Sequence, residues 1–93
     1  MAIGDTTRPV PLPGSDQQLK TGGAWYYGYI VRAAGAAGVA IYDGTSAAGR
    51  LLGQTTLAAA GEQTVALPFP VWAADGIFVD IVSGSPTGSV FIA

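Results

Sequence analysis

Histidine and cysteine are both absent from this chain of 93 residues. Without cysteine no disulfide can form, and without either residue the usual ligands of transition metals are missing. A Ser-His-Asp hydrolase is excluded as well, because no imidazole is present to accept the proton of a serine nucleophile. We therefore expect no cofactor, no metal and no catalysis, and a protein that works through binding or assembly.

Charged residues are also scarce, at 11% of the chain against about 25% in an average soluble domain. Only four residues are basic and the net charge is -2, so no basic surface is available for a phosphate backbone and we expect no nucleic-acid binding. Hydrophobic residues make up 49% of the chain. This balance favours a protein that buries part of its surface against copies of itself or another protein.

Long apolar runs are missing too. No stretch approaches the roughly 18 residues of a membrane-spanning helix, and residues 1–8 have neither the basic nor the apolar region of a signal peptide. We expect no membrane association, and the lack of cysteine fits assembly in a reducing cytoplasm. The length allows one domain with one modest core, for which oligomerisation is the remaining common source of added stability.

The first 20 residues form a segment of distinct composition. Proline fixes φ and favours extended geometry at the preceding residue, so we interpret residues 1–20 as an extended N-terminal arm with polyproline-II character. The arm is either a frayed terminus or a tether that docks on a neighbouring protein. Its candidate contact residues alternate proline with apolar side chains: Pro9, Val10, Pro11, Leu12 and Pro13.

Residues 21–93 show short β-type runs separated by turn residues. The runs are Ala24–Arg32, Val39–Tyr42, Arg50–Leu57, Gln63–Phe69, Gly76–Val82 and Ser89–Ala93. A weaker run near Gln18–Thr21 lies at the junction with the arm. The spacing predicts an all-β fold, a small antiparallel β-sandwich of jelly-roll or immunoglobulin-like type with about seven strands. We expect a core of Val39, Ile41, Leu51, Leu57, Val65, Leu67, Ile77, Val79, Ile81 and Phe91.

The run Ala24–Arg32 is rich in aromatic residues. The two-residue period of a strand predicts that Trp25, Tyr27, Tyr29 and Val31 share one face, with Tyr26, Gly28, Ile30 and Arg32 on the other. Large side chains on both faces indicate that neither face is freely solvated. We expect the aromatic residues of this chain to lie in the core or at a subunit interface. The alternative is a sugar-binding platform that includes Trp25, Tyr27 or Trp72.

The carboxylates show no catalytic pattern. Asp43, Glu62 and Asp75 each stand beside glycine in a turn context, which explains them without chemistry. The stretch from Asp43 to Ser46 is a weak candidate for calcium, because the closely spaced oxygen ligands of a calcium loop are missing. Asp80 lies within a strand on a face that also carries Phe78 and Val82. It is either a solvent-facing position or an ion-pair partner of Arg32 or Arg50 across a subunit interface.

The pattern from Val39 onward resembles the small β-sandwich virion proteins of tailed bacteriophages, of the head-decoration (cement) or fibre-associated kind. The segments that carry the resemblance are Val39–Ser46 (VAIYDGTS), Gly49–Gly53 (GRLLG), Leu57–Glu62 (LAAAGE), Leu67–Pro70 (LPFP) and Gly76–Val79 (GIFV). The resemblance implies a protein without an active site that forms symmetric oligomers on a capsid shell. It also implies that an extended terminal arm contacts neighbouring capsid subunits.

Our leading hypothesis is a capsid decoration protein, favoured as a trimer, that binds the major capsid protein or other virion proteins. It would be assembled in the host cytoplasm and located on the capsid surface of the virion. The alternatives are a tail, baseplate or fibre-adaptor component and a carbohydrate-binding module. The residues expected at a subunit interface are Trp25, Tyr27, Tyr29, Arg32, Phe78 and Asp80.

Overall fold

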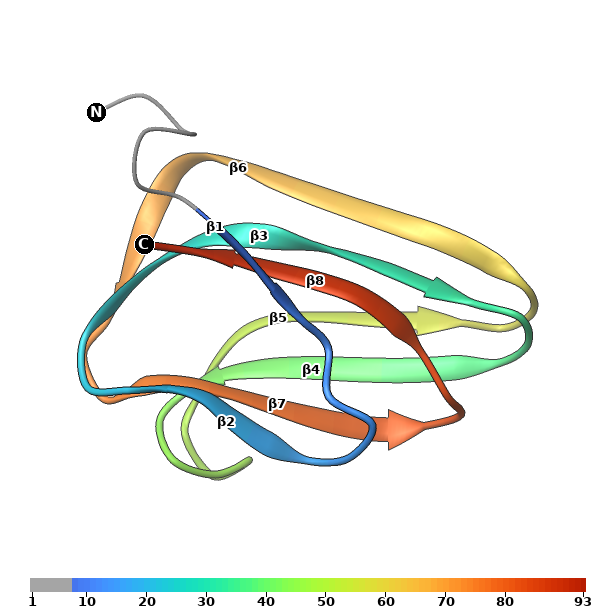
Figure 1. The fold of residues 1–93 in the computed structure, drawn as a ribbon, viewed down its shortest axis with the longest axis horizontal. Helices are drawn as coiled ribbons and strands as arrows, with labels where there is room; N and C mark the ends of the chain where they lie inside the picture. Colours follow the sequence, from blue (N-terminus) through green and yellow to red (C-terminus); the bar gives the residue numbers. More distant parts are fainter. Residues whose placement is uncertain (1–7) are drawn as a thin grey trace.

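The computed structural model describes residues 8–93, which form eight strands in two antiparallel sheets (Figure 1). The first sheet has the order β1-β8-β3-β6 and the second has the order β2-β7-β4-β5. The strands are β1 (Arg8–Pro11), β2 (Gln17–Thr21), β3 (Ala24–Ala33), β4 (Ala37–Asp43), β5 (Arg50–Leu57), β6 (Gly61–Ala73), β7 (Gly76–Ser83) and β8 (Thr87–Ile92). The expected all-β fold with antiparallel sheets is confirmed, with eight strands instead of about seven.

The additional strand is β1, which lies inside the segment that we interpreted as an arm. It pairs with β8, with Val10 opposite Val90, and the Leu12 amide donates a 3.0 Å hydrogen bond to the carbonyl of Gly88. β2, which also lies partly in that segment, pairs with β7. Within the expected arm, residues 8–11 and 17–20 are therefore strands of the two sheets, and residues 1–7 of the arm lie outside the described residues.

The alternating prolines explain how this segment can be a strand. Backbone groups of successive residues in a strand point to opposite sides, so the amides of Val10 and Leu12 face β8. The nitrogens of Pro9 and Pro11 then face the open edge, where no hydrogen bond is lost. The pattern that suggested polyproline II is equally suited to an edge strand.

The core lies between the two sheets. Of the expected core residues, Val39, Ile41, Ile77 and Val79 are buried, and Leu57, Val65, Leu67 and Ile81 are partly buried and pack against them. The core also contains residues that we did not expect: Ala24, Tyr26, Tyr29, Val31, Ala73, Val90 and Ile92, with Val10, Leu12, Leu19 and Leu52 partly buried around them. Residues of β1 and β3 thus contribute more to the core than their composition suggested.

A bulge at Tyr27 changes which residues of β3 face the core. Tyr26 lies opposite Ile92 and Gly28 lies opposite Phe91, so Tyr27 is left without a partner in the ladder. Gly28 has φ of 130°, and a Cβ there would collide with a carbonyl oxygen of β6. The bulge therefore requires glycine at its second position.

The expected faces of β3 are wrong because of this bulge. One extra residue shifts the alternation, so Tyr26 joins Tyr29 and Val31 in the core while Trp25 is exposed. Trp25 was expected on the same face as Tyr29 and Val31. A strict period of two holds on each side of the bulge but not across it.

Two expected core residues lie outside the core. In the pairing of β5 with β4, Ile41 is opposite Gly53 and Tyr42 is opposite Leu51, so Leu52 is an extra residue. This shift turns Leu52 toward the core and leaves Leu51 exposed. Phe91 is half-buried outside the core cluster, because its neighbours Val90 and Ile92 are the inward residues of β8.

Candidate interaction surfaces

Trp25 and Trp72 form an exposed aromatic pair on the first sheet. They lie opposite each other on β3 and β6, with ring centroids 5.0 Å apart and an interplanar angle of 58°. Their exposed fractions are 41% and 47%. The backbone of Trp25 is fixed by two hydrogen bonds to Ala93, of 2.8 and 2.9 Å. The pair forms an apolar platform that is accessible to solvent.

Further large apolar side chains are exposed on β5, β6 and β7. Phe69 on β6 is 78% exposed and Val82 on β7 is 62% exposed. On the second sheet, Tyr42 is flanked by Leu51 of β5 and Phe78 of β7, which gives an apolar row across three strands. Cross-strand neighbours share a face of the sheet, so this row lies on the outside of the molecule. Both sheets therefore present apolar groups to solvent.

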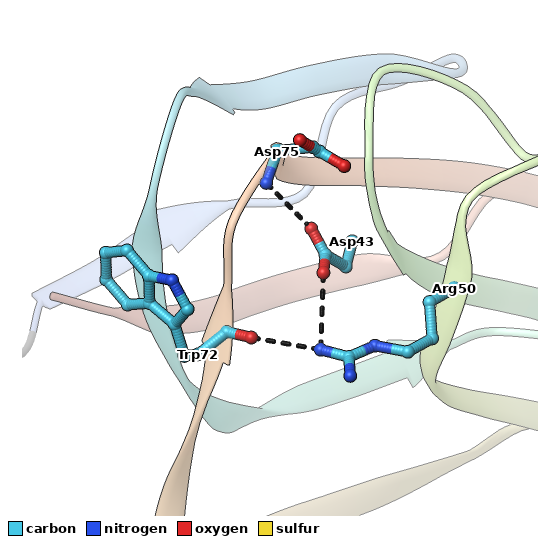
Figure 2. A network of polar contacts seen from close by, with 4 residues as sticks. All are labelled: Asp43, Arg50, Trp72 and Asp75. Carbon is cyan, nitrogen blue, oxygen red and sulfur yellow. Dashed lines mark hydrogen bonds and ion pairs between the residues drawn. The ribbon is translucent and has the colours of Figure 1, made fainter.

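A polar network connects β4 and β5 to the turn between β6 and β7 (Figure 2). The nearly buried carboxylate of Asp43 accepts a 3.0 Å hydrogen bond from the backbone amide of Asp75 and a 3.2 Å bond from the Arg50 guanidinium. The same guanidinium nitrogen donates a 3.0 Å bond to the carbonyl of Trp72. Arg50 thereby helps to hold the end of β6 on which the exposed tryptophan lies.

An open pocket of about 440 Å³ lies beside this network, lined by Asp43, Gly44, Thr45, Ser46, Ala48, Gly49 and Asp75. Both carboxylate oxygens of Asp43 already accept hydrogen bonds from the chain itself. Within residues 8–93, no group of three or more acidic, histidine or cysteine side chains could hold a metal ion. The hydrogen bonds of Asp43 hold together the turn after β4 and the turn between β6 and β7. The sequence likewise placed Asp43 and Asp75 in turns.

Asp80 lies beside another carboxylate. Asp16 accepts a 2.8 Å hydrogen bond from the backbone amide of Ile81, which brings the two acidic side chains together. Desolvation, the negative charge of Asp16 and a hydrogen bond with Asp16 raise the pKa of Asp80 above its usual range. The two arginines that we considered as partners of Asp80 have partners within the protomer, because Arg32 pairs with Glu62 and Arg50 with Asp43. An ion pair across an interface stays a prediction.

The residues expected at a subunit interface differ in their accessibility. Tyr27 and Tyr29 are buried within the protomer, while Phe78 and Asp80 are half-buried and Trp25 and Arg32 are exposed. The last four can therefore contact a partner without a change in the fold. Sequence reasoning missed Phe69 and Leu51, although the prolines on either side of Phe69 were a signal that its strand departs from a regular ladder.

The residues expected to make arm contacts also divide into two groups. Val10, Leu12 and Pro13 are half-buried, and the first two pack against the core of this chain. Pro9 and Pro11 are exposed along the open edge of β1. Contact of this segment with a neighbouring protein stays a prediction, in which the exposed prolines are the accessible part.

Three buried tyrosines differ in their hydrogen bonding. The Tyr29 hydroxyl donates to the carbonyl of Gln54 at 3.0 Å and accepts from the Thr55 hydroxyl at 2.6 Å. The buried hydroxyls of Tyr26 and Tyr27 have no hydrogen-bond partner among the described residues. Burial raises the pKa of Tyr26, with a smaller contribution from Tyr29. The Tyr26 phenol therefore stays neutral, and the rings of Tyr26 and Tyr27 act as packing groups.

Over residues 8–93 there is no helix long and apolar enough to span a membrane. Comparison with known proteins gives no match to a family model, to a curated protein or to a solved structure.

Proposed function

We propose that this chain is a non-enzymatic structural subunit of a virus particle, with a jelly-roll fold, that binds to the outside of a protein shell. The strand orders β1-β8-β3-β6 and β2-β7-β4-β5 support the fold assignment. In each sheet, strands from the two halves of the chain alternate, as two interlocked Greek keys require. Jelly rolls of eight strands occur in viral capsid proteins and in lectins.

The observation that carries the proposal is the amount of apolar surface on the outside of a chain with little charge. Trp25, Leu51, Phe69, Trp72 and Val82 are all exposed large hydrophobic residues. Only 11% of the residues are charged, which is too few to keep such a surface solvated in an isolated monomer. Contacts with the shell and with other copies of the chain would cover these groups.

The expected mechanism is stabilisation by binding. A protein that binds the assembled shell at many symmetry-related sites, and binds free shell subunits less well, shifts the equilibrium toward the assembled state. The partner in this proposal is the major capsid protein or another virion protein, and no chemical step is required. The apolar row around Tyr42 and the tryptophan pair are the surfaces offered for these contacts.

The test is deletion of the gene from the virus that encodes it, followed by heating of the purified particles. We expect particles that lack the chain to release their genome at a lower temperature than complete ones. Addition of purified chain should restore the original temperature, whereas addition of the Trp72→Ser and Leu51→Ser variant should not. Particles of unchanged heat resistance would contradict a role in reinforcing the shell.

The tryptophan pair also supports a second candidate function, carbohydrate binding. Two exposed aromatic rings held 5.0 Å apart form a platform on which a sugar ring could stack. The test is tryptophan fluorescence during titration with a panel of oligosaccharides, with the Trp72→Ala variant as control. Saturable quenching that is lost in the variant would favour this function, and unchanged fluorescence across the panel would contradict it.

A further inference from the structure

The four edge strands of the molecule differ in how far they can pair with another chain. β1 is closed by prolines, and β2 and β5 each have a shift in the register of their pairing. Prolines and bulges both hinder the addition of a further strand. The pairing of β6 with β3 also has a shift, between Ala66 and Val71. It is regular from Gly61 opposite Ala33 to Ala66 opposite Gly28, which is the longest unshifted run on the four edge strands. Within residues 8–93, β3 is the one hydrogen-bonded neighbour of β6, so its other edge is open.

We propose that this open edge of β6 pairs with β6 of a second copy of the chain, antiparallel and about a two-fold axis at Thr64. Figure 1 shows β6 along the outer margin of the molecule. The contact would join the first sheets of two protomers into one continuous sheet. It is a β-strand addition in which main-chain hydrogen bonds supply the attraction.

The prolines of β1 exclude a head-to-tail arrangement of copies and favour a two-fold arrangement. A head-to-tail contact would join β6 of one copy to β1 of the next and would continue as a filament. Pro9 and Pro11 close the edge of β1 against it. Pairing of β6 with itself about a two-fold axis needs only the one open edge, and it closes after two copies.

The sequence of β6 determines where the axis lies. Proline-free pairing can extend from Gly61 to Leu67, because Pro68 interrupts the ladder. Antiparallel pairing of this segment with itself uses its full length when Thr64 faces its own copy. In that register Glu62 lies opposite Ala66 of the second copy, so the acidic side chains do not face each other.

The same register accounts for the most exposed large apolar residue. If Thr64 faces its own copy, Phe69 lies two residues beyond the paired segment, beside the exposed turn between β5 and β6 of the second copy. The phenyl ring, 78% exposed in the protomer, would then pack on the alanines of that turn. The contact thus covers an apolar group that the fold of one chain leaves in solvent.

Disulfide capture tests the contact, because the chain has no cysteine of its own. In the two-fold pairing the Cβ atoms at position 64 are about 4.5–5.5 Å apart, close enough for a disulfide to form with a small adjustment. We expect the Thr64→Cys variant to form a covalent dimer in a glutathione redox buffer. The matched variant Thr56→Cys, at an exposed threonine of β5, should be captured at least about tenfold more slowly. Equal capture of the two variants, or none at position 64, would overturn the proposal.

A second pair of variants tests the contact without a covalent bond. Thr64→Lys places two like charges opposite each other at the axis, whereas Thr56→Lys adds the same charge away from it. By sedimentation equilibrium, Thr64→Lys should raise the dimer dissociation constant at least about tenfold and Thr56→Lys should leave it unchanged. Circular dichroism should show the same folded spectrum for both. A monomeric mass of the unmodified chain, or an oligomer that Thr64→Lys does not weaken, would overturn the proposal.

The dimer and the proposed role in a virus particle can fail separately. The cysteine and lysine variants are measured on the purified chain, without a shell. If these variants show no β6 contact, the proposed role in a virus particle is still tested separately by the heating of particles. A dimer that forms through β6 but has no effect on particles would instead contradict only the proposed function.

Discussion

The hydroxyl of Tyr29, on β3 of the first sheet, donates a 3.0 Å hydrogen bond to the carbonyl of Gln54, on β5 of the second. The Thr55 hydroxyl donates a 2.6 Å bond to the same phenol. Tyr29 therefore joins the two sheets by hydrogen bonds as well as by packing. Removal of its hydroxyl should leave Thr55 buried and without this partner.

We predict that Tyr29→Phe lowers the free energy of unfolding by about 1–3 kcal/mol, because a buried polar group loses its partner. Tyr26→Phe is the matched variant, since the Tyr26 hydroxyl is buried without a partner among the described residues. Its removal should be neutral or stabilising. Urea unfolding of both variants measures the difference, and an equal loss of stability in the two would contradict the assignment.

Gly28→Ala should destabilise the protein by about 3 kcal/mol or more, because it combines backbone strain with a steric clash. The φ angle of Gly28 is 130°, and an added Cβ would meet the carbonyl oxygen of Val65. Gly35→Ala is the control, since a Cβ at Gly35 meets no atom within 4 Å. Its effect should stay within about 0.5 kcal/mol in thermal unfolding. Similar unfolding midpoints for the two variants would show that β3 has no bulge at Tyr27.

Asp43→Ala should cost about 2 kcal/mol of stability, since it removes two hydrogen bonds and leaves the Asp75 amide without an acceptor. Asp75→Ala keeps the backbone amide that makes the bond, so it should cost less than about 1 kcal/mol. Urea unfolding of the two variants gives the comparison. The reverse order of stabilities would mean that the Asp75 carboxylate, and not the network in Figure 2, holds the turns.

The effect of Asp80→Asn on stability should depend on pH. Because desolvation and Asp16 raise the pKa of Asp80 in the folded state, the folded chain binds this proton more tightly than the unfolded chain. Asp80 therefore becomes less favourable for folding as pH rises through its titration. Asp80→Asn should be more stable than the unmodified protein at about pH 7 and should lose that advantage at about pH 3, where the carboxyl group is protonated.

Chemical unfolding at the two pH values measures this effect, and Asp75→Asn serves as the control on an exposed carboxylate. Added salt should reduce the advantage of Asp80→Asn near neutral pH, because it screens the charge of Asp16. An advantage that is the same at both pH values would mean that proximity to Asp16 does not affect Asp80.

The sequence allowed the all-β class and several core residues to be predicted, because Val39, Ile41, Ile77 and Val79 follow the alternation of regular strands. It failed where one extra residue shifts that alternation. Tyr27 in β3 and Leu52 in β5 are such residues, and each changes which neighbouring side chains face the core. A bulge depends on pairing between distant strands, so a local pattern does not reveal it.

The described part of this segment, Arg8–Leu12, differs from the expected arm for a related reason. Alternating prolines favour extended backbone, but the composition alone does not distinguish a free arm from an edge strand. The pairing of Val10 with Val90 decides between them, and that contact joins opposite ends of the chain. The exposure of Phe69 and the open edge of β6 likewise follow from strand order, which the spacing of the runs left undetermined.

The most direct test of the proposed role is the number of copies of this chain in each purified virus particle, measured by quantitative mass spectrometry against the major capsid protein. A protein that covers symmetry-related sites on the shell should be present in on the order of hundreds of copies. A few to about a dozen copies would contradict decoration of the head and would favour a tail, baseplate or fibre-adaptor component, for which the same symmetry argument gives small numbers. Absence from the particle would contradict a structural role in the virion altogether.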